Sequence, residues 1–169
     1  FQCLNSVITV GNYTNDSGYV NNLSNWKSEA GTRGEIHSNS SKGPTRHGAL
    51  KPEIAASGAT TVSSFPIHLY SGMSDADLAF GGKHYRNGGT SMSSPVVAGV
   101  AALYLEKCNQ GNYTHFRNDL ISSSYSDGWT GTLPNYDFGY GKLDGFQTLV
   151  HNGVDDTTVS TGCDSLLWN

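Results

Sequence analysis

Apolar residues gather in a few short stretches of this chain, separated by long polar segments. Residues 6–11, SVITVG, form a β-branched run closed by glycine, which predicts a buried strand. A second strand or hairpin is expected at residues 61–64. The polar, Asn- and Ser-rich residues 12–48 predict loops with one or two short strands, for which residues 35–38 are a candidate position. Residues 73–90 predict another loop.

The pattern changes in the second half of the chain, where two helices are predicted. Residues 94–107, SPVVAGVAALYLEK, are apolar almost all round, which is typical of a helix buried inside a larger body. Pro95 suits the first turn of such a helix, where its missing N–H costs nothing. Residues 113–123 predict an amphipathic helix that either Thr114 or Asn112 caps.

The chain length of 169 residues suits one domain. Residues 138–150 follow a Gly-rich turn and are expected to hold a last short strand and a helical turn. We expect residues 1–150 to form the domain, with residues 151–169 as a polar tail.

Charge and hydropathy exclude several classes of partner. Ten basic and fourteen acidic residues give a net charge of −4, without a basic patch, so we expect no nucleic-acid partner. No stretch approaches the roughly 18 apolar residues of a membrane span, so we expect no membrane partner. No cofactor is evident, because the acidic residues do not cluster as a calcium site requires. The acids nearest to each other are interpreted as solvated loop residues: Asp75, Asp77, Asp155 and Asp156.

The cysteines and sequons give a weak indication of an extracellular protein. Cys3, Cys108 and Cys163 form no CxxC pair, which argues against zinc. A disulfide between Cys108 and Cys163 would tie the tail to the end of a helix, and the sequence alone does not establish that pairing. Asn-x-Ser/Thr sequons, some of which arise by chance in so Asn-rich a chain, begin at Asn12, Asn15, Asn22, Asn39 and Asn112.

Residues 88–95, GGTSMSSP, place a serine where a glycine turn meets the predicted buried helix. Two glycines permit a backbone turn that other residues adopt poorly. The first N–H groups of a helix lack intrahelical partners and carry the positive end of the dipole, which favours a developing oxyanion. Ser91 is therefore a candidate nucleophile if a histidine base stands nearby. The alternative is an ordinary helix cap, a role for which Ser and Thr are preferred.

The longer string GTSMSSPVVAGVAAL closely resembles the nucleophile signature of the subtilases, the subtilisin-like serine peptidases. Their pattern is Gly-Thr-Ser-Met-(Ala/Ser)-(Ser/Thr)-Pro, followed by a buried helix containing Ala-Gly. SVITVG, the Ser41–Pro44 segment with LKPEIAASG at 50–58, and GYGKLDGFQTL at 139–149 are similar to other segments of that family, so the resemblance covers about residues 6–150. One departure is Ser57, where the family usually has proline. Matching positions in the signature are Gly89, Thr90, Ser91, Met92, Ser93, Ser94, Pro95, Ala98 and Gly99.

The resemblance implies a three-layer α/β fold with a mainly parallel sheet and helices on both faces, of which this chain supplies the C-terminal portion. It implies a serine endopeptidase acting on proteins or peptides by acyl transfer. Ser91 would attack the scissile carbonyl, its own N–H would form half of the oxyanion hole, and Thr90 would add a weaker hydroxyl contact. Calcium sites are common in that family, so a structural calcium is an expectation for the parent enzyme.

In that family the catalytic Asp and His and the oxyanion Asn precede the segments that this chain resembles. We therefore expect an upstream half of the catalytic domain as the partner of this chain, which alone would be inactive and would expose its nucleophile helix. The alternative is a non-catalytic remnant of a subtilase that acts as a binding or complementation module.

Asp16-Ser17-Gly18 and His47-Gly48 superficially resemble the missing Asp and His motifs. Asn12–Asn15 are polar where the family has a buried strand before its Asp. His47 also lacks the residues that normally follow the catalytic His, and it lies too close to Ser91 in sequence for the intervening elements. A turn at Asp16 and a surface loop at His47 are therefore expected, with a compact triad of Asp16, His47 and Ser91 as the alternative.

Overall fold

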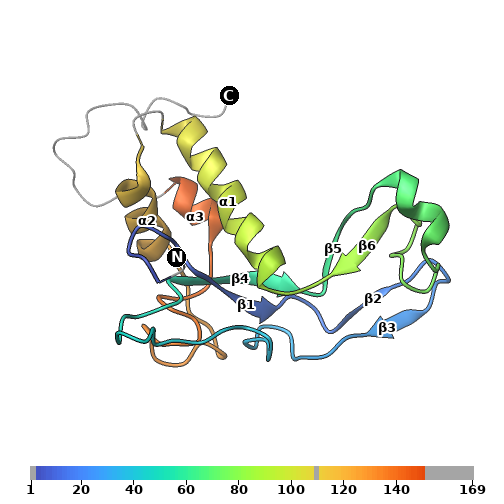
Figure 1. Cartoon of the computed structure of the whole chain (residues 1–169), viewed down its shortest axis with the longest axis horizontal. Helices are drawn as coiled ribbons and strands as arrows, with labels where there is room; N and C mark the ends of the chain where they lie inside the picture. Colours follow the sequence, from blue (N-terminus) through green and yellow to red (C-terminus); the bar gives the residue numbers. More distant parts are fainter. Residues whose placement is uncertain (1–2, 109–110, 151–169) are drawn as a thin grey trace.

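The computed structural model describes residues 3–108 and 111–150. A pair of parallel strands, β1 (Val10–Thr14) and β4 (Ile54–Ala59), lies at its centre, with Val10 opposite Ile54. Lys142 extends the pair on the other side of β4 through a single parallel bridge to Ala55. The helices α1 (Thr90–Lys107), α2 (Tyr113–Ser122) and α3 (Gly145–Val150) lie together on one side of this pair (Figure 1).

The hydrophobic core forms where α1 and α2 pack on β4. Ile54 and Ala56 on the strand meet Val97 and Tyr104 on α1, and Leu120 on α2 completes the cluster with Phe116 and Cys108. The Tyr104 ring contacts Phe116 edge-on, and its hydroxyl donates a 2.5 Å hydrogen bond to Asp119. Burial and this hydrogen bond raise the pKa of Tyr104 well above its ordinary value, so the phenol stays neutral.

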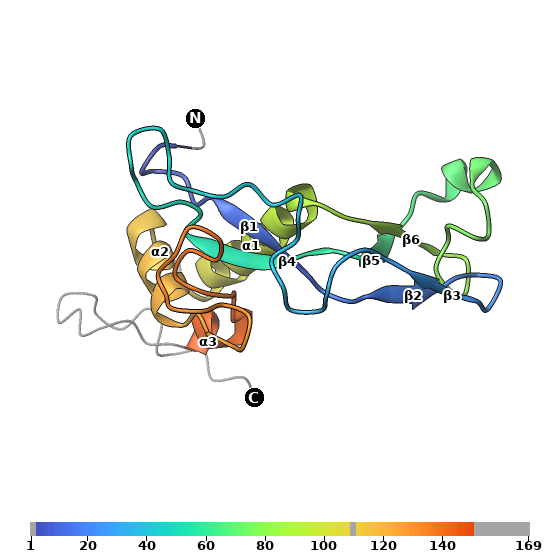
Figure 2. The ribbon, with the colours of Figure 1, turned by 90° about the horizontal axis from the view of Figure 1, so that it is seen from below.

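A long arm extends away from this core (Figures 1 and 2). It consists of two antiparallel hairpins, β2 (Gly18–Val20) with β3 (Trp26–Ser28), and β5 (Thr61–Ser64) with β6 (His84–Asn87). Between β5 and β6 the chain forms the 3-10 helix η1 (Ile67–Gly72).

Several sequence predictions are confirmed. A strand forms at Thr61–Ser64, and a helix occupies residues 113–122. Of the two caps considered for that helix, Asn112 is the one used, since its side chain accepts hydrogen bonds from the N–H groups of Thr114 and His115.

Other predictions were wrong in position or kind. The strand expected at residues 6–11 begins at Val10, because its parallel partner starts only at Ile54 and a turn precedes it. The region about residues 35–38 gives a single bridge from Tyr13 to Ile36 rather than a strand. The loop expected at residues 73–90 contains β6, and the strand expected after residue 138 is reduced to the bridges of Lys142.

The helix α1 is less buried than its composition predicts. Ser93, Val97 and Tyr104 face the core, whereas Val96, Leu103 and Leu105 are 38%, 50% and 48% exposed. The surface of this almost wholly apolar helix is therefore uncovered on both flanks of its core-facing stripe in the part of the chain that the structure describes.

The cysteine and sequon predictions meet different outcomes. Cys3 is exposed and free. The proposed pairing of Cys108 with Cys163, like Asp155, Asp156 and the tail 151–169, involves residues outside those described. Asn12 begins a sequon but is fully buried, so a glycan on its side chain is incompatible with this fold.

A buried polar network holds the loops under the strand pair. Lys142, 1% exposed, donates hydrogen bonds to Gly34 O at 2.6 Å and to Asp127 Oδ2 at 2.5 Å. Burial works against ionisation of Asp127, but the hydrogen bonds from Lys142 and from the N–H groups of Trp129 and Thr130 outweigh it, so the pKa of Asp127 lies below its ordinary value.

We expect Asp127→Asn to destabilise the chain by about 2 kcal/mol at pH 7, because it leaves the buried Lys142 ammonium without its counter-charge. A lowered folded pKa contributes stability above the unfolded value near pH 4, and this stability is lost as the pH falls through the folded value. In the variant, the free energy of unfolding measured by urea denaturation should therefore fall less steeply as the pH is lowered below about 4 than it does in the parent. The matched control Asp137→Asn breaks the exposed pair with Lys42 and should cost under ~0.5 kcal/mol; equal losses in the two variants would contradict the prediction.

The crossing of α1 over β4 depends on Gly58. A Cβ on this residue would lie 2.0 Å from Ser93 Oγ and 2.7 Å from both Asn12 Oδ1 and Gly89 O. These neighbours are backbone or fully buried side chains, so they have little room to move.

Gly58→Ala is expected to cost roughly 1–3 kcal/mol through overpacking, measured as the change in unfolding free energy. Gly99→Ala is the matched control, since a Cβ there meets nothing within 4 Å. The control should stabilise α1 by up to ~1 kcal/mol through helix propensity. Similar effects of the two changes would show that α1 does not press on Gly58.

Candidate active site

The turn at Gly88–Gly89 delivers Ser91 to the first turn of α1. Gly89 is the N-cap residue, with φ 127°, a backbone conformation that glycine adopts far more readily than other residues. Its N–H donates to Gly58 O at 2.9 Å, so the end of β4 fixes the turn directly. Its carbonyl accepts from the N–H groups of Met92 and Ser93, which starts the helix.

The structure shows that this serine is not the cap of the helix. The N-cap is Gly89, and no side chain makes a capping hydrogen bond there. Ser91 is exposed, Thr90 is half-buried beside it, and no hydrogen bond joins the Ser91 hydroxyl to another described residue. The hydroxyl is thus exposed and has no hydrogen-bond partner among the described residues, and it lies next to N–H groups that have no carbonyl partner within the helix.

A chain of hydrogen bonds lies behind this turn. Ser93 Oγ donates to Asn12 Oδ1 at 3.1 Å, and Asn12 Nδ2 donates to Asn39 Oδ1 at 2.8 Å. The Asn12 backbone N–H donates to Ser40 Oγ at 2.9 Å. Strand β1, the loop at residues 39–40 and the first turn of α1 are therefore joined through one buried carboxamide.

Sequence reasoning noticed Asn12 and Asn39 only as sequons and missed their role behind Ser91. The available signal was the buried-strand run that ends in Val10-Gly11, directly before a polar residue. A carboxamide at the end of such a run must find partners when it is buried. Ser93, two residues after the nucleophile candidate, supplies one of them.

The compact triad receives no support from the described hydrogen bonds. Asp16 Oδ1 accepts from the N–H of the adjacent Ser17, as in the local turn that the sequence predicts. His47 is exposed in a turn closed by a hydrogen bond from Gly48 N–H to Thr45 O. No hydrogen bond among the described residues connects either side chain to Ser91.

The described residues contain no group of three or more His, Cys, Asp or Glu side chains able to hold a metal ion. Asp75 and Asp77, interpreted above as solvated loop acids, lie at the surface of the arm and also have partners there. Asp75 accepts a 2.7 Å hydrogen bond from Asn22, and Asp77 pairs with Lys27. In the same part of the chain, no helix is long and apolar enough to cross a bilayer.

Solved structures of similar fold include the CspB protease of Clostridium perfringens and fervidolysin from Fervidobacterium pennivorans, a keratinolytic enzyme related to subtilisin. Each superimposes with a TM-score of 0.57 at 24% identity, over 89% and 86% of this chain respectively. The match covers 28% of the CspB chain and 19% of the fervidolysin chain. The expected partial α/β fold is thereby confirmed.

Two relatives from Bacillus subtilis are similar in sequence. The serine protease AprX is 36% identical over 72 residues, which is 43% of this chain and 16% of AprX. Bacillopeptidase F is 30% identical over 113 residues, 64% of this chain and 7% of that protein. The chain thus spans less than a fifth of either relative's length.

The model of the subtilase family matches residues 2–141, which include the glycine turn, Ser91 and both central strands. This match covers most of the chain and agrees with the fold and with the serine at the helix start. The chain belongs to the subtilase family of serine peptidases.

Proposed function

We propose that Ser91 is the nucleophile of a serine endopeptidase whose His, Asp and oxyanion Asn come from a segment outside this chain. The observation that carries the proposal is the position of Ser91, exposed and free of hydrogen bonds in the first turn of the central helix of a subtilase. Its substrates would be proteins or peptides, and Thr90 would add a hydroxyl at the edge of the site.

The proposed chemistry is acyl transfer. Ser91 Oγ forms a bond to the scissile carbonyl carbon while a His of the other segment accepts the hydroxyl proton. The Ser91 N–H and the Asn of that segment hold the oxyanion. The C–N bond then breaks as the His returns the proton to the leaving amine, and water releases the acyl group from Ser91.

The exposed surface of α1 supports the requirement for another segment. Val96, Leu103 and Leu105 present apolar surface that a soluble protein normally covers. We propose that the upstream half of the catalytic domain packs on this surface, which also brings its catalytic groups to the N-terminal turn of the same helix.

An extracellular location of the parent enzyme remains part of this proposal. Of the five sequons, Asn15 is exposed, whereas Asn12 is fully buried. Asn22, Asn39 and Asn112 use their side chains in hydrogen bonds within the fold. Asn15 is therefore the residue at which a glycan would be expected first, if the source adds them.

The alternative function is a non-catalytic remnant that binds or complements another protein. The observation in its favour is that no described histidine or carboxylate makes a hydrogen bond to Ser91. The two functions differ in whether Ser91 is ever activated.

Fluorophosphonate labelling tests the proposal on the protein as isolated, with its intact mass measured in parallel. We expect labelling at Ser91 when an upstream segment is present, its loss in Ser91→Ala, and its retention in Ser126→Ala, which alters an exposed serine elsewhere. An unlabelled Ser91 in the assembled protein would favour the remnant. Labelling of the 169-residue chain alone would overturn the need for a second segment and revive the triad of Asp16 and His47.

A further inference from the structure

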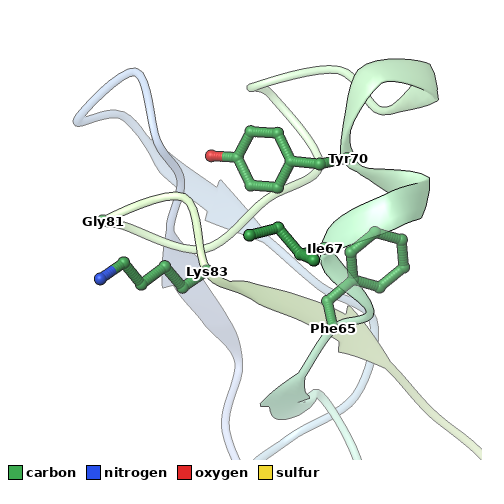
Figure 3. A pocket seen from close by; sticks show the side chains of 5 residues that line it. All are labelled: Phe65, Ile67, Tyr70, Gly81 and Lys83. Atoms are coloured by element: carbon green, nitrogen blue, oxygen red, sulfur yellow. The ribbon is translucent and has the colours of Figure 1, made fainter.

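The arm carries a hollow of about 420 Å³ that none of the roles above uses (Figure 3). Phe65, Ile67, Tyr70, Gly81 and Lys83 line it. These residues come from the segment between β5 and β6, at the end of the arm farthest from the helices.

The hollow is a depression open to solvent, lined mainly by apolar side chains, with a single charge at its rim. Ile67 is 86% exposed and points into the space between Tyr70 and Lys83 (Figure 3). The Phe65 ring lies against Tyr85, with 5.3 Å between the ring centroids, which fixes one wall. A Cβ built on Gly81 would meet nothing within 4 Å, so the space over this backbone is open.

The Tyr70 hydroxyl approaches the Gly82 backbone closely. A Cβ on Gly82 would lie 2.1 Å from the Tyr70 hydroxyl oxygen, so this approach depends on the missing side chain. The Phe65 ring and the Tyr70 hydroxyl therefore each have a neighbour within the arm that favours their present positions.

The arm is also braced as a unit. Asn22 N–H donates to Leu78 O and Phe80 N–H donates to Val20 O, both at 2.9 Å, which joins the segment before β6 to the β2–β3 hairpin. Arg86 on β6 pairs with Glu29, which follows β3.

Lys83 differs from the other cationic side chains of the arm. Lys27 pairs with Asp77 and Arg86 pairs with Glu29, but Lys83 is exposed and makes no ion pair with a described residue. A ligand that carries a carboxylate could therefore form an ion pair with Lys83 at this rim.

The hollow is directly connected to the nucleophile turn. Strand β6 (His84–Asn87) lies between Lys83 and the Gly88–Gly89 turn, and Lys83 stands eight positions before Ser91. At about 3.3–3.6 Å per residue, the two are at most ~29 Å apart, a span that about eight residues of extended peptide cover. A polypeptide held at Ser91 is thus long enough to reach the hollow.

We propose that this hollow is a substrate-recognition site that binds an extended polypeptide segment several residues away from the cleaved bond, through an apolar or aromatic side chain next to an acidic residue. The apolar side chain contacts Ile67, Phe65 and Tyr70, and the carboxylate pairs with Lys83. The inference rests on the proposed peptidase function for the identity of the occupant, and it narrows that function to substrates with such a segment.

The test measures binding rather than turnover, on the protein as isolated, with its upstream segment where one is present, carrying Ser91→Ala. The probe is a fluorescein-labelled Gly/Ser peptide with one Phe-Glu step, and its anisotropy is followed during titration at low salt. We expect saturable binding that weakens about fivefold when Lys83→Glu is added, and about tenfold with Ile67→Ser. A Phe-Lys peptide should reverse its preference and bind the Lys83→Glu variant better than the parent.

Arg46→Glu is the matched control, because it makes the same change of net charge at an exposed loop residue away from the arm. It should leave probe binding unchanged, and all variants should keep the melting temperature of the parent. Equal weakening by Lys83→Glu and Arg46→Glu would overturn the proposal, since binding would then follow net charge. Self-association that Ile67→Ser abolishes, without probe binding, would assign the hollow to a second copy of the chain and also overturn it.

This test separates the recognition site from the peptidase function on which it rests. Because Ser91 is absent from the binding assay, a failure of fluorophosphonate labelling leaves the binding result standing. Conversely, if Ser91 is labelled but the peptide probe does not bind, the peptidase function is supported and the proposed recognition site is rejected.

Discussion

The close approach of α1 to the end of β4 is the constraint on which the rest of this structure depends. It is made possible by a missing side chain at Gly58, where Ser93, Asn12 and the Gly89 carbonyl crowd around one position. The same contact sets the angle at which the helix leaves the sheet and the place where its first turn stands. The exposed serine is thus positioned by the packing of the core rather than by a flexible loop.

Polar groups within this contact make it specific as well as close. Apolar packing alone would tolerate small shifts of the helix along the strand, but the hydrogen bonds from Ser93 to Asn12 and from Asn12 to Asn39 would be broken by such a shift. Buried groups that lose their partners cost more than they contribute when paired. The network therefore favours one position of the turn over its near alternatives.

The predictability of this fold from sequence follows the strength of the local signals. The glycine turn and the helix that carry Ser91 were predictable because glycine, serine, proline and a long apolar run all indicate the same element. Strand β6 was missed because HYRN lacks an apolar alternation, and only its pairing with β5 makes it a strand. Strands β2 and β3 lie within residues 12–48, where one or two short strands were expected, but their positions were not predicted. Val20 and Trp26 are apolar and yet exposed, so hydrophobic alternation does not mark these strands. The network behind Ser91 joins residues 12, 39 and 93, which no local pattern relates.

The β5–β6 hairpin has a consequence for how this molecule can change over evolution. Its strands hold both ends of the segment from Phe65 to Lys83 in fixed register, from Thr61 opposite Asn87 to Ser64 opposite His84. Lengthening a loop whose ends are already held together costs little, since closure entropy grows only with the logarithm of its length. Residues 65–73 can therefore change in length and sequence, while residues 75–80, which are bonded to the β2–β3 hairpin, and the helix that presents the serine stay in place. Substitutions that change what the tip of the arm binds can therefore accumulate without lowering the stability of the core.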